Sequence, residues 1–187
     1  MLETLDTIAW ASLAVIAGRT AEGIPGALRE LCSPNPDTRH KAYWRIDNYV
    51  VVQSDLFEAA WYVVPFLLEI VESSISNGRC EVYDLLYEIG NGSAPSDSVI
   101  TLGNATTQPL AIACRHAVRA GLPLYIRELQ TSRDEVREKA LALIMSLNDH
   151  EHTVLPSLME LITHEIDPNF RQKLLRTMAD LHSQPDL

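Results

Sequence analysis

A short pattern led by proline occurs four times in the chain, and it constrains the fold more than any other feature. Each copy has an aliphatic residue, a proline and then apolar residues at helical spacing. An arginine follows each proline after fourteen or fifteen residues, although the copies themselves are unevenly spaced. An internal offset that survives uneven spacing is typical of a repeated structural unit. The prolines are Pro25, Pro65, Pro123 and Pro156, and the arginines are Arg39, Arg79, Arg137 and Arg171.

Each repeated unit is predicted to be a pair of helices. The proline fits the first turn of a short helix, where its missing N–H costs nothing. A polar turn follows, and then a second helix with apolar residues at i, i+3 and i+4, most clearly over residues 136–147. Asp37, Asp134 and Asp167 fall at or beside the starts of second helices, where a carboxylate can cap free N–H groups. The single β-rich run, residues 49–53, lies at a helix end, so the pattern predicts an all-α fold.

The spacing of the copies predicts how the pairs are organised. Successive prolines are 40, 58 and 33 residues apart, which favours an α-solenoid of about four helix pairs in one domain, residues 1–187. The longest gap contains residues 91–109, which have no helical period and many turn-forming residues. We expect a long inserted loop there. The loop serves either as a flexible connector or as a segment that becomes ordered on binding a partner, and we favour the connector. The apolar pattern of residues 8–18 predicts that they form an amphipathic first helix.

The compartment is inferred from the N-terminal charges and the cysteines. Glu3 and Asp6 precede the apolar residues 8–18 without any basic residue, which is the wrong charge for an export signal. The three cysteines, Cys32, Cys80 and Cys114, are odd in number and form no CxxC pair, which favours a reducing compartment. No run approaches the roughly 18 apolar residues that span a bilayer. We therefore expect a cytoplasmic protein that does not insert into membranes.

The sequence contains no recognisable catalytic motif. The densest group of metal-ligand side chains is Asp149-His150-Glu151-His152, in a predicted turn. Its histidines are two residues apart, whereas a helical zinc site uses histidines four apart, so we interpret the group as accidental. The cysteines have no activating neighbour and fit the core. We expect no catalytic residue, no metal and no cofactor.

The charge distribution points to the class of partner. The net charge is -10, which argues against nucleic acid as the main partner because phosphate binding needs a basic patch. Between residues 47 and 110 there are nine acidic residues and one basic residue, and nine of the twelve aromatic residues fall between Tyr43 and Tyr87. Aromatic side chains supply contact energy and carboxylates supply steering, so this region suits a basic protein. The competing interpretation is a solvated face that keeps the protein soluble.

Candidate contact residues follow from helical spacing in this region. Over residues 81–89 the apolar positions form a core face, Glu81, Asp84 and Glu88 share another face, and two tyrosines flank it. The tyrosines are expected to be partly exposed. The predicted partner-binding residues are Asp55, Glu58, Trp61, Glu81, Tyr83, Asp84, Tyr87 and Glu88.

The repeats resemble HEAT repeats, most clearly in residues 133–147 followed by residues 155–162. The order of residues 8–31, 39–46 and 51–71 is also similar to that of small bacterial HEAT-repeat proteins. The resemblance implies a protein-binding scaffold, and some members of such groups are immunity proteins that neutralise antibacterial toxins. We therefore expect a non-catalytic immunity protein that binds a basic toxin domain. The first alternative is a general adaptor or assembly scaffold. The second is a DNA-repair or lyase-linked HEAT protein, which is less favoured because the chain has 15 basic residues against 25 acidic ones.

Overall fold

The computed structural model describes residues 2–103, 105–131, 134–147 and 154–183. These residues contain nine α-helices and four short strands, which confirms the predicted all-α class apart from the strands. Among them, no helix is both long and apolar enough to cross a membrane. The chain divides into two compact units, Met1–Leu124 and Tyr125–Leu187. The single domain expected from the sequence stays a prediction.

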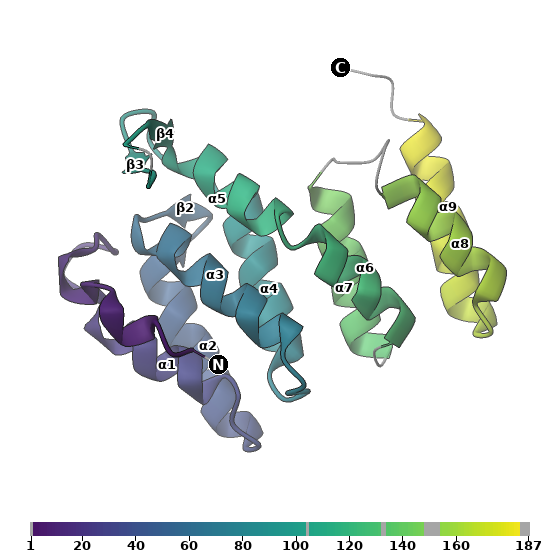
Figure 1. Ribbon diagram of the computed structural model, residues 1–187, viewed down its shortest axis with the longest axis horizontal. Helices are drawn as coiled ribbons and strands as arrows, with labels where there is room; N and C mark the ends of the chain where they lie inside the picture. The colour runs from purple at the N-terminus through teal and green to yellow at the C-terminus, as the bar shows by residue number, and fades with distance from the viewer. Residues whose placement is uncertain (1, 104, 132–133, 148–153, 184–187) are drawn as a thin grey trace. The chain divides into compact units, whose positions relative to one another are not determined.

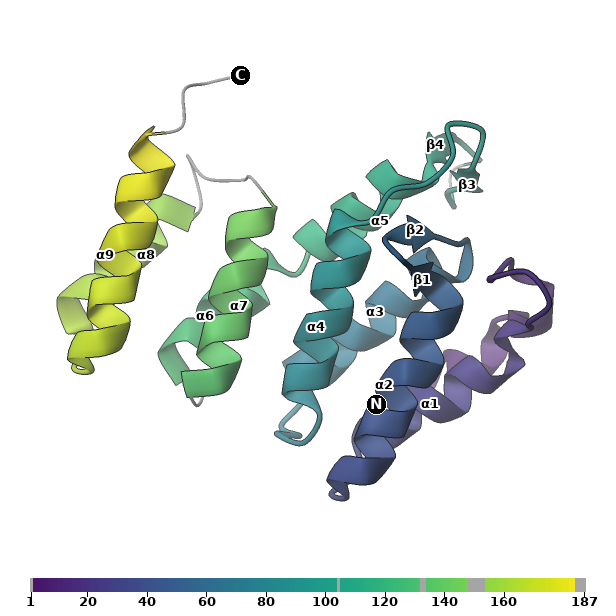
Figure 2. The ribbon, with the colours of Figure 1, turned by 180° about the vertical axis from the view of Figure 1, so that it is seen from behind.

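The first unit is built from helices that pack in two layers. Helix α1 (Ile24–Glu30) packs on α2 (Pro36–Val50), and α3 (Ala59–Glu72) packs on α4 (Arg79–Asn91) and on α5 (Leu110–Arg119). Helices α2 and α4 lie side by side (Figure 2), and α3 and α5 form the opposite side of the unit (Figure 1). Their apolar faces form one core, which is fully buried at Leu28, Ile46, Val63, Leu67, Leu85 and Leu86.

The repeated arginines of the first unit tie each second helix to the turn that precedes it. Arg39 donates from Nη1 to the carbonyl oxygens of Ser33 and Pro34, at 3.0 and 3.2 Å. Arg79 donates from Nη2 to the carbonyl oxygen of Ser73 at 2.6 Å. Carbonyls at a helix C-terminus lack partners within the helix, and a charged donor satisfies them strongly. The constant offset between proline and arginine therefore has a structural cause in these two pairs.

One of the four prolines does not open its helix. Pro65 lies inside α3, which begins at Ala59, so the predicted helix start at this copy is wrong. The turn before Pro65 buries Ala60, Val63 and Val64, and this burial offsets the backbone hydrogen bond that proline removes. The other three prolines lie second in their helices, as predicted: Pro25 in α1, Pro123 in α6 (Leu122–Thr131) and Pro156 in α8 (Leu155–His164).

Asparagine rather than aspartate caps α2. The Oδ1 atom of Asn35 accepts hydrogen bonds from the backbone N–H groups of Asp37 and Thr38, at 2.9 and 3.4 Å. Asp37 lies in the first turn, where its charge is favourable to the helix dipole. The sequence located this helix start correctly but assigned the cap to the wrong residue.

The predicted amphipathic helix over residues 8–18 is wrong. The N-terminal segment contains three single turns of 3₁₀-helix, η1 (Leu5–Thr7), η2 (Trp10–Ser12) and η3 (Ala21–Gly23). The indole N–H of Trp10 donates to the carbonyl oxygen of Leu5 at 2.7 Å. Local hydrogen bonds of this kind compete with the regular helical ladder, so apolar spacing alone does not produce an α-helix here.

The N-terminal segment lies against α3. The Leu2 N–H donates to Glu69 at 2.5 Å, and the Trp10 ring packs on Phe66 with centroids 6.1 Å apart. The Ala14 carbonyl accepts from the Ala59 N–H at 3.0 Å, at the start of α3. Contacts to α3 thus replace the hydrogen bonds that a helix over this segment would have made.

Two short antiparallel hairpins depart from the purely helical prediction. Strands β1 (Val51–Val52) and β2 (Asp55–Leu56) pair across Gln53 and Ser54, whose φ angles of 51° and 70° are those of a tight hairpin turn. Strands β3 (Val99–Thr101) and β4 (Thr107–Pro109) lie within residues 91–109. This segment was expected to be an irregular loop, but Ile100 is 2% exposed and pins the hairpin to the unit. Three-residue strands are too short for an alternating pattern to stand out.

Gly78 allows α4 to approach the end of α1. It precedes Arg79 with a φ of 80°, a left-handed conformation that side chains rarely adopt. A Cβ atom at this position would lie 1.9 Å from the carbonyl oxygen of Leu31. Only glycine meets both conditions, so the contact between these two helix pairs depends on this residue.

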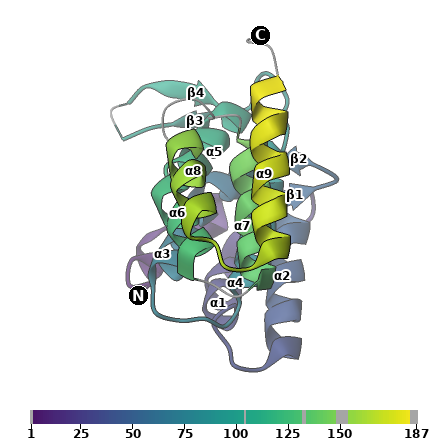
Figure 3. The same cartoon turned by 90° about the vertical axis from the view of Figure 1, so that its right-hand side faces the viewer.

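The second unit contains most of α6, together with α7 (Asp134–Ser146), α8 and α9 (Pro168–Ser183). Helices α8 and α9 pack against each other as a pair (Figure 3). Asp167 accepts from the Asn169 N–H at 2.9 Å, which confirms the predicted cap of α9, whereas the Asp134 side chain lies outside the described residues. The core of the unit includes Tyr125, Leu129, Ala140, Leu143, Ile144, Leu158, Phe170 and Leu174.

A buried ion pair joins the elements of the second unit. Arg137 in α7 pairs with Glu165 after α8, and their side chains are 11% and 5% exposed. Arg137 also donates from Nε to the Leu129 carbonyl oxygen at 2.9 Å, and its guanidinium lies 3.7 Å from the ring centroid of Phe170. Burial alone would raise the pKa of Glu165, but hydrogen bonds from the Asp167 N–H and from Arg137 outweigh it and lower this pKa below its ordinary value.

Candidate functional site

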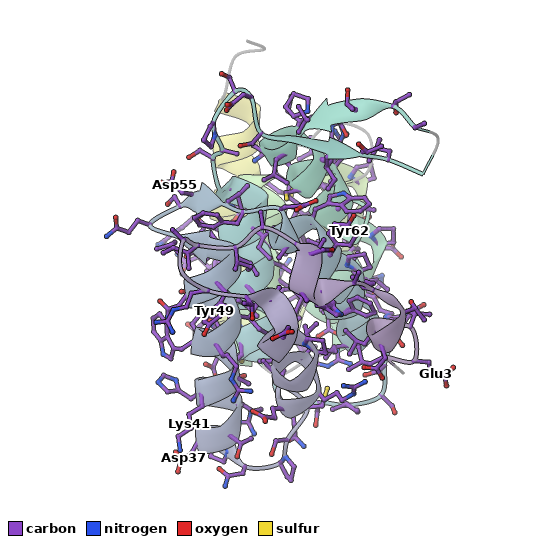
Figure 4. The ribbon with its side chains drawn as sticks, turned by 90° about the vertical axis from the view of Figure 1, so that its left-hand side faces the viewer. Glu3, Asp37, Lys41, Tyr49, Asp55 and Tyr62 are labelled. Atoms are coloured by element: carbon purple, nitrogen blue, oxygen red, sulfur yellow. The ribbon has the colours of Figure 1, made fainter. Side chains whose placement is uncertain are left out.

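The eight predicted contact residues lie in three places. Asp55 is exposed and projects from the β1–β2 hairpin (Figure 4). Glu58 and Trp61 lie at the start of α3, and the others lie along α4. Glu58 accepts from the Ala14 N–H at 2.9 Å, and Trp61 is half-buried with its ring edge-on to Tyr62, 5.0 Å between centroids. Glu58 and Trp61 thus belong to α3 rather than α4, whereas Asp55 bridges to Ser93, just after the end of α4.

Two of the predicted α4 residues are engaged in contacts within the fold. Tyr83 is 1% exposed, so the expectation of partial exposure is wrong for this residue. The reason is that the buried face of α4 is wide enough to include Tyr83 beside Val82 and Leu86. Glu81 is half-buried and pairs with Arg39 of α2 at 3.1 Å, which links the first two helix pairs. Both residues stabilise the fold rather than present a surface.

The remaining α4 residues face two residues of α2. Asp84 and Glu88 are half-buried and Tyr87 is 41% exposed. Tyr43 and Asp47 lie one turn apart on α2, and Asp47, Asp84 and Glu88 all act on the Tyr43 hydroxyl electrostatically. We call these five residues, Tyr43, Asp47, Asp84, Tyr87 and Glu88, the α2–α4 acidic face.

An exposed tryptophan adjoins this face. Trp44 is 46% exposed and lies edge-on to Tyr43, with ring centroids 5.0 Å apart. Its indole N–H donates to Nε2 of His40 at 3.0 Å, which holds the ring in one orientation. A large aromatic ring that is exposed yet fixed is the kind of side chain that contributes most to protein interfaces.

The electrostatics of the face favour a positive charge. Burial, together with the charge of Glu88, raises the pKa of Asp47 to about 6. Burial and the three neighbouring carboxylates also raise the pKa of Tyr43 above its ordinary value. Both shifts have the sign expected where negative charges crowd together in a partly desolvated place. A cation placed among these groups would relieve the repulsion.

Replacing Asp47 by asparagine is expected to stabilise the protein at neutral pH. The folded-state pKa lies above the unfolded-state value, so the folded protein loses stability as pH rises from about 4 to about 6. Discounted for solvent screening at this half-buried site, the gain for Asp47→Asn at pH 7 is about 1–2 kcal/mol. At pH 4 the gain should vanish.

Urea unfolding at both pH values measures this difference, with Asp55→Asn as the control at an exposed carboxylate. Equal effects of Asp47→Asn at pH 4 and pH 7 would contradict the raised pKa of Asp47.

Sequence reasoning missed Tyr43 and Asp47 as members of the site. Both residues lie in the region that is rich in acidic and aromatic residues. Their i, i+4 spacing already indicated that they share one face of a helix. The sequence did not reveal that α2 and α4 are neighbours while α3 lies in the other layer. That arrangement is a property of packing between helices, not of the pattern along either one.

Other candidate chemistry is limited. Within the described residues no three His, Cys, Asp or Glu side chains gather as a metal site would require. The sequence 149–152, singled out for its metal-ligand residues, lies outside the described residues. Burial raises the pKa of Cys114 to about 12 and also raises that of Cys32, which makes both thiols poor nucleophiles.

Comparison with known proteins gives no relative. No family model, no curated protein and no solved structure matches the chain. The function is therefore argued from the α2–α4 acidic face and the fold that presents it.

Proposed function

We propose that the chain is a HEAT-like α-solenoid that acts without catalysis, as an immunity protein that binds and neutralises a basic toxin domain. The solenoid part is supported by four helix pairs, α1–α2, α3–α4, α6–α7 and α8–α9, which carry the repeated proline and arginine. Helix pairs of this kind cannot bury their apolar faces alone, and stacking provides both a core and an extended surface.

The observation that carries the binding proposal is the crowding of carboxylates on the α2–α4 acidic face. Asp47, Asp84 and Glu88 lie around Tyr43, and Asp47 holds a pKa of about 6 because of burial and the charge of Glu88. Burial of the charged Asp47 and its repulsion by Glu88 are both unfavourable in the isolated protein. A lysine or arginine from a partner would remove the repulsion on binding, so part of the binding energy comes from relief of this cost.

Neutralisation needs only occlusion of the toxin's active site. The net charge of -10 would steer a basic domain toward the protein and speed association. The exposed rings of Trp44 and Tyr87 would then supply apolar contact beside the carboxylates. Surfaces that bind nucleic acid are rich in Lys and Arg, which neutralise phosphates, so a protein that covers those groups blocks substrate without any reaction.

The first test is affinity purification of the tagged protein from its native cell, with co-purifying proteins identified by mass spectrometry. One stoichiometric basic partner, whose toxicity is suppressed when the two proteins are produced together, is the expected result. Several substoichiometric partners would instead indicate an adaptor. Nucleic-acid binding that falls steeply with salt would indicate a DNA-processing role.

Charge reversal on the α2–α4 acidic face is expected to weaken that complex strongly. The double variant Asp84→Lys and Glu88→Lys places two positive charges against cationic groups of the partner, and it should cost about 2–5 kcal/mol of binding energy. The control is Glu72→Lys with Asp97→Lys, two exposed positions with the same total change in charge. Calorimetry with the identified partner measures the binding energy of both double variants. Equal losses of binding energy would show that the α2–α4 acidic face acts only through long-range steering.

A further inference from the structure

The second unit contains a pocket that the α2–α4 acidic face does not involve. Its volume is about 470 Å³, and residues of α6, α7, α8 and the turn between α8 and α9 line it. Arg137 and Glu165 contribute their ion pair. Its lining also includes three exposed polar residues, Gln130, Glu160 and His164, and two aliphatic residues, Leu161 and Ile166.

The charges around the pocket decide which ligand it accepts. Arg137 is already engaged by Glu165 and by the Leu129 carbonyl, so an anion would have to displace a buried partner. The Glu160 carboxylate, by contrast, has no hydrogen-bond or ion-pair partner anywhere in the part of the chain that is described. Among its carboxylates and its arginine, the pocket therefore offers one uncommitted carboxylate and no uncommitted guanidinium, which favours a cationic ligand.

The turn after α8 holds an apolar side chain in solvent beside this pocket. Ile166 is 95% exposed, although both of its neighbours are fixed. Glu165 accepts from the Asp167 N–H at 2.9 Å and pairs with Arg137, and Asp167 in turn caps α9. A preorganised turn that presents an exposed aliphatic residue reduces the ordering cost of binding and provides a surface for a ligand's methylene groups.

We propose that this pocket binds an arginine side chain of a protein partner. The guanidinium pairs with Glu160 and is within reach of the Gln130 amide, and the methylene stem covers Leu161 and Ile166. A guanidinium fits better than an ammonium because it is planar, donates in a fork to a carboxylate and is more weakly hydrated, which suits a half-apolar pocket. The site lies in the second unit and does not depend on the α2–α4 acidic face.

The proposal is tested by NMR titration of the full chain with N-acetyl-arginine amide. Saturable shifts are expected at the backbone amides of Gln130 and residues 160–166. N-acetyl-citrulline amide, which has the same shape without the charge, should not produce them. Glu160→Gln should weaken the arginine probe about fivefold, whereas Asp97→Asn makes the same chemical change at an exposed residue of the first unit and should leave its affinity unchanged.

Three results would overturn the assignment: equal shifts with citrulline, no loss of affinity in Glu160→Gln, or equal affinity for N-acetyl-lysine amide. Amides of α2 and α4 are read in the same spectra, so binding at the α2–α4 acidic face is scored separately. Failure of either site therefore leaves the result at the other unaffected.

Discussion

Replacing Arg137 by methionine is expected to lower the free energy of unfolding by about 3–5 kcal/mol. The substitution keeps an unbranched side chain about as long as the arginine stem but leaves the Glu165 carboxylate, 5% exposed, without its guanidinium. It also removes the hydrogen bond to the Leu129 carbonyl and the contact with the Phe170 ring. A buried charge without its partner is among the most destabilising changes that one substitution can make. Urea unfolding of the full chain at pH 7 measures the loss.

Arg171 provides the matched control because it occupies the same position in the last copy of the repeat. Its side chain is exposed, so Arg171→Met should change stability by less than about 0.5 kcal/mol. The deficit of Arg137→Met should also shrink in acid, because protonation of Glu165 removes the unpaired charge. The double variant with Glu165→Leu should recover part of the loss. If the Arg137 and Arg171 variants were equally stable, the buried ion pair would have no structural role.

Replacing Gly78 by alanine is expected to destabilise the protein by about 3–5 kcal/mol. Two costs combine at this position. The φ of 80° is unfavourable for any residue with a side chain, and the new methyl group would overlap the Leu31 carbonyl oxygen, 1.9 Å away. The neighbour in this contact is backbone and cannot rotate aside, so the start of α4 must move away from the end of α1. Thermal and urea unfolding should both report the loss.

Two other glycines separate these costs. Gly18 has a φ of 78° and nothing within 4 Å of the place where a methyl group would lie, so Gly18→Ala should cost only the conformational part, about 1–2 kcal/mol. Gly26 lies in α1 with open space around it, and Gly26→Ala should stabilise the helix by about 0.5–1 kcal/mol. The predicted order of stability is therefore Gly26→Ala, wild type, Gly18→Ala and Gly78→Ala. A Gly78 variant as stable as the Gly18 variant would show that the close contact with α1 is not tight.

The helices were predictable because their signals are local. Pro25, Pro123 and Pro156 mark helix starts through a missing N–H, and the apolar spacing of residues 136–147 belongs to α7 alone. The errors occur where longer-range contacts decide. Residues 8–18 have helical spacing, but Trp10 packs on Phe66 of α3 and its indole bonds to Leu5. Pro65 stays inside a helix because the preceding turn is buried against other helices.

The candidate site was predicted in part for the same reason. The positions of Asp84, Tyr87 and Glu88 on one helix follow from spacing within α4, and the structure keeps them on an accessible side. The inward position of Tyr83 and the pairing of Glu81 with Arg39 depend on which helices surround α4. The presence of Asp47 in the site also depends on how the helices pack, because α2 and α4 are far apart in the sequence but adjacent in the first unit.

The packing of the N-terminal segment on α3 has a consequence for how the first unit forms during synthesis. Leu2 bonds to a residue 67 positions later, and Ala14 to one 44 positions later. At a translation rate of about 5–20 residues per second, several seconds pass before α3 leaves the ribosome. Helices α1 and α2 are complete by then, so the contact of Trp10 with Phe66 of α3 forms only after these two helices, although Trp10 is made before them.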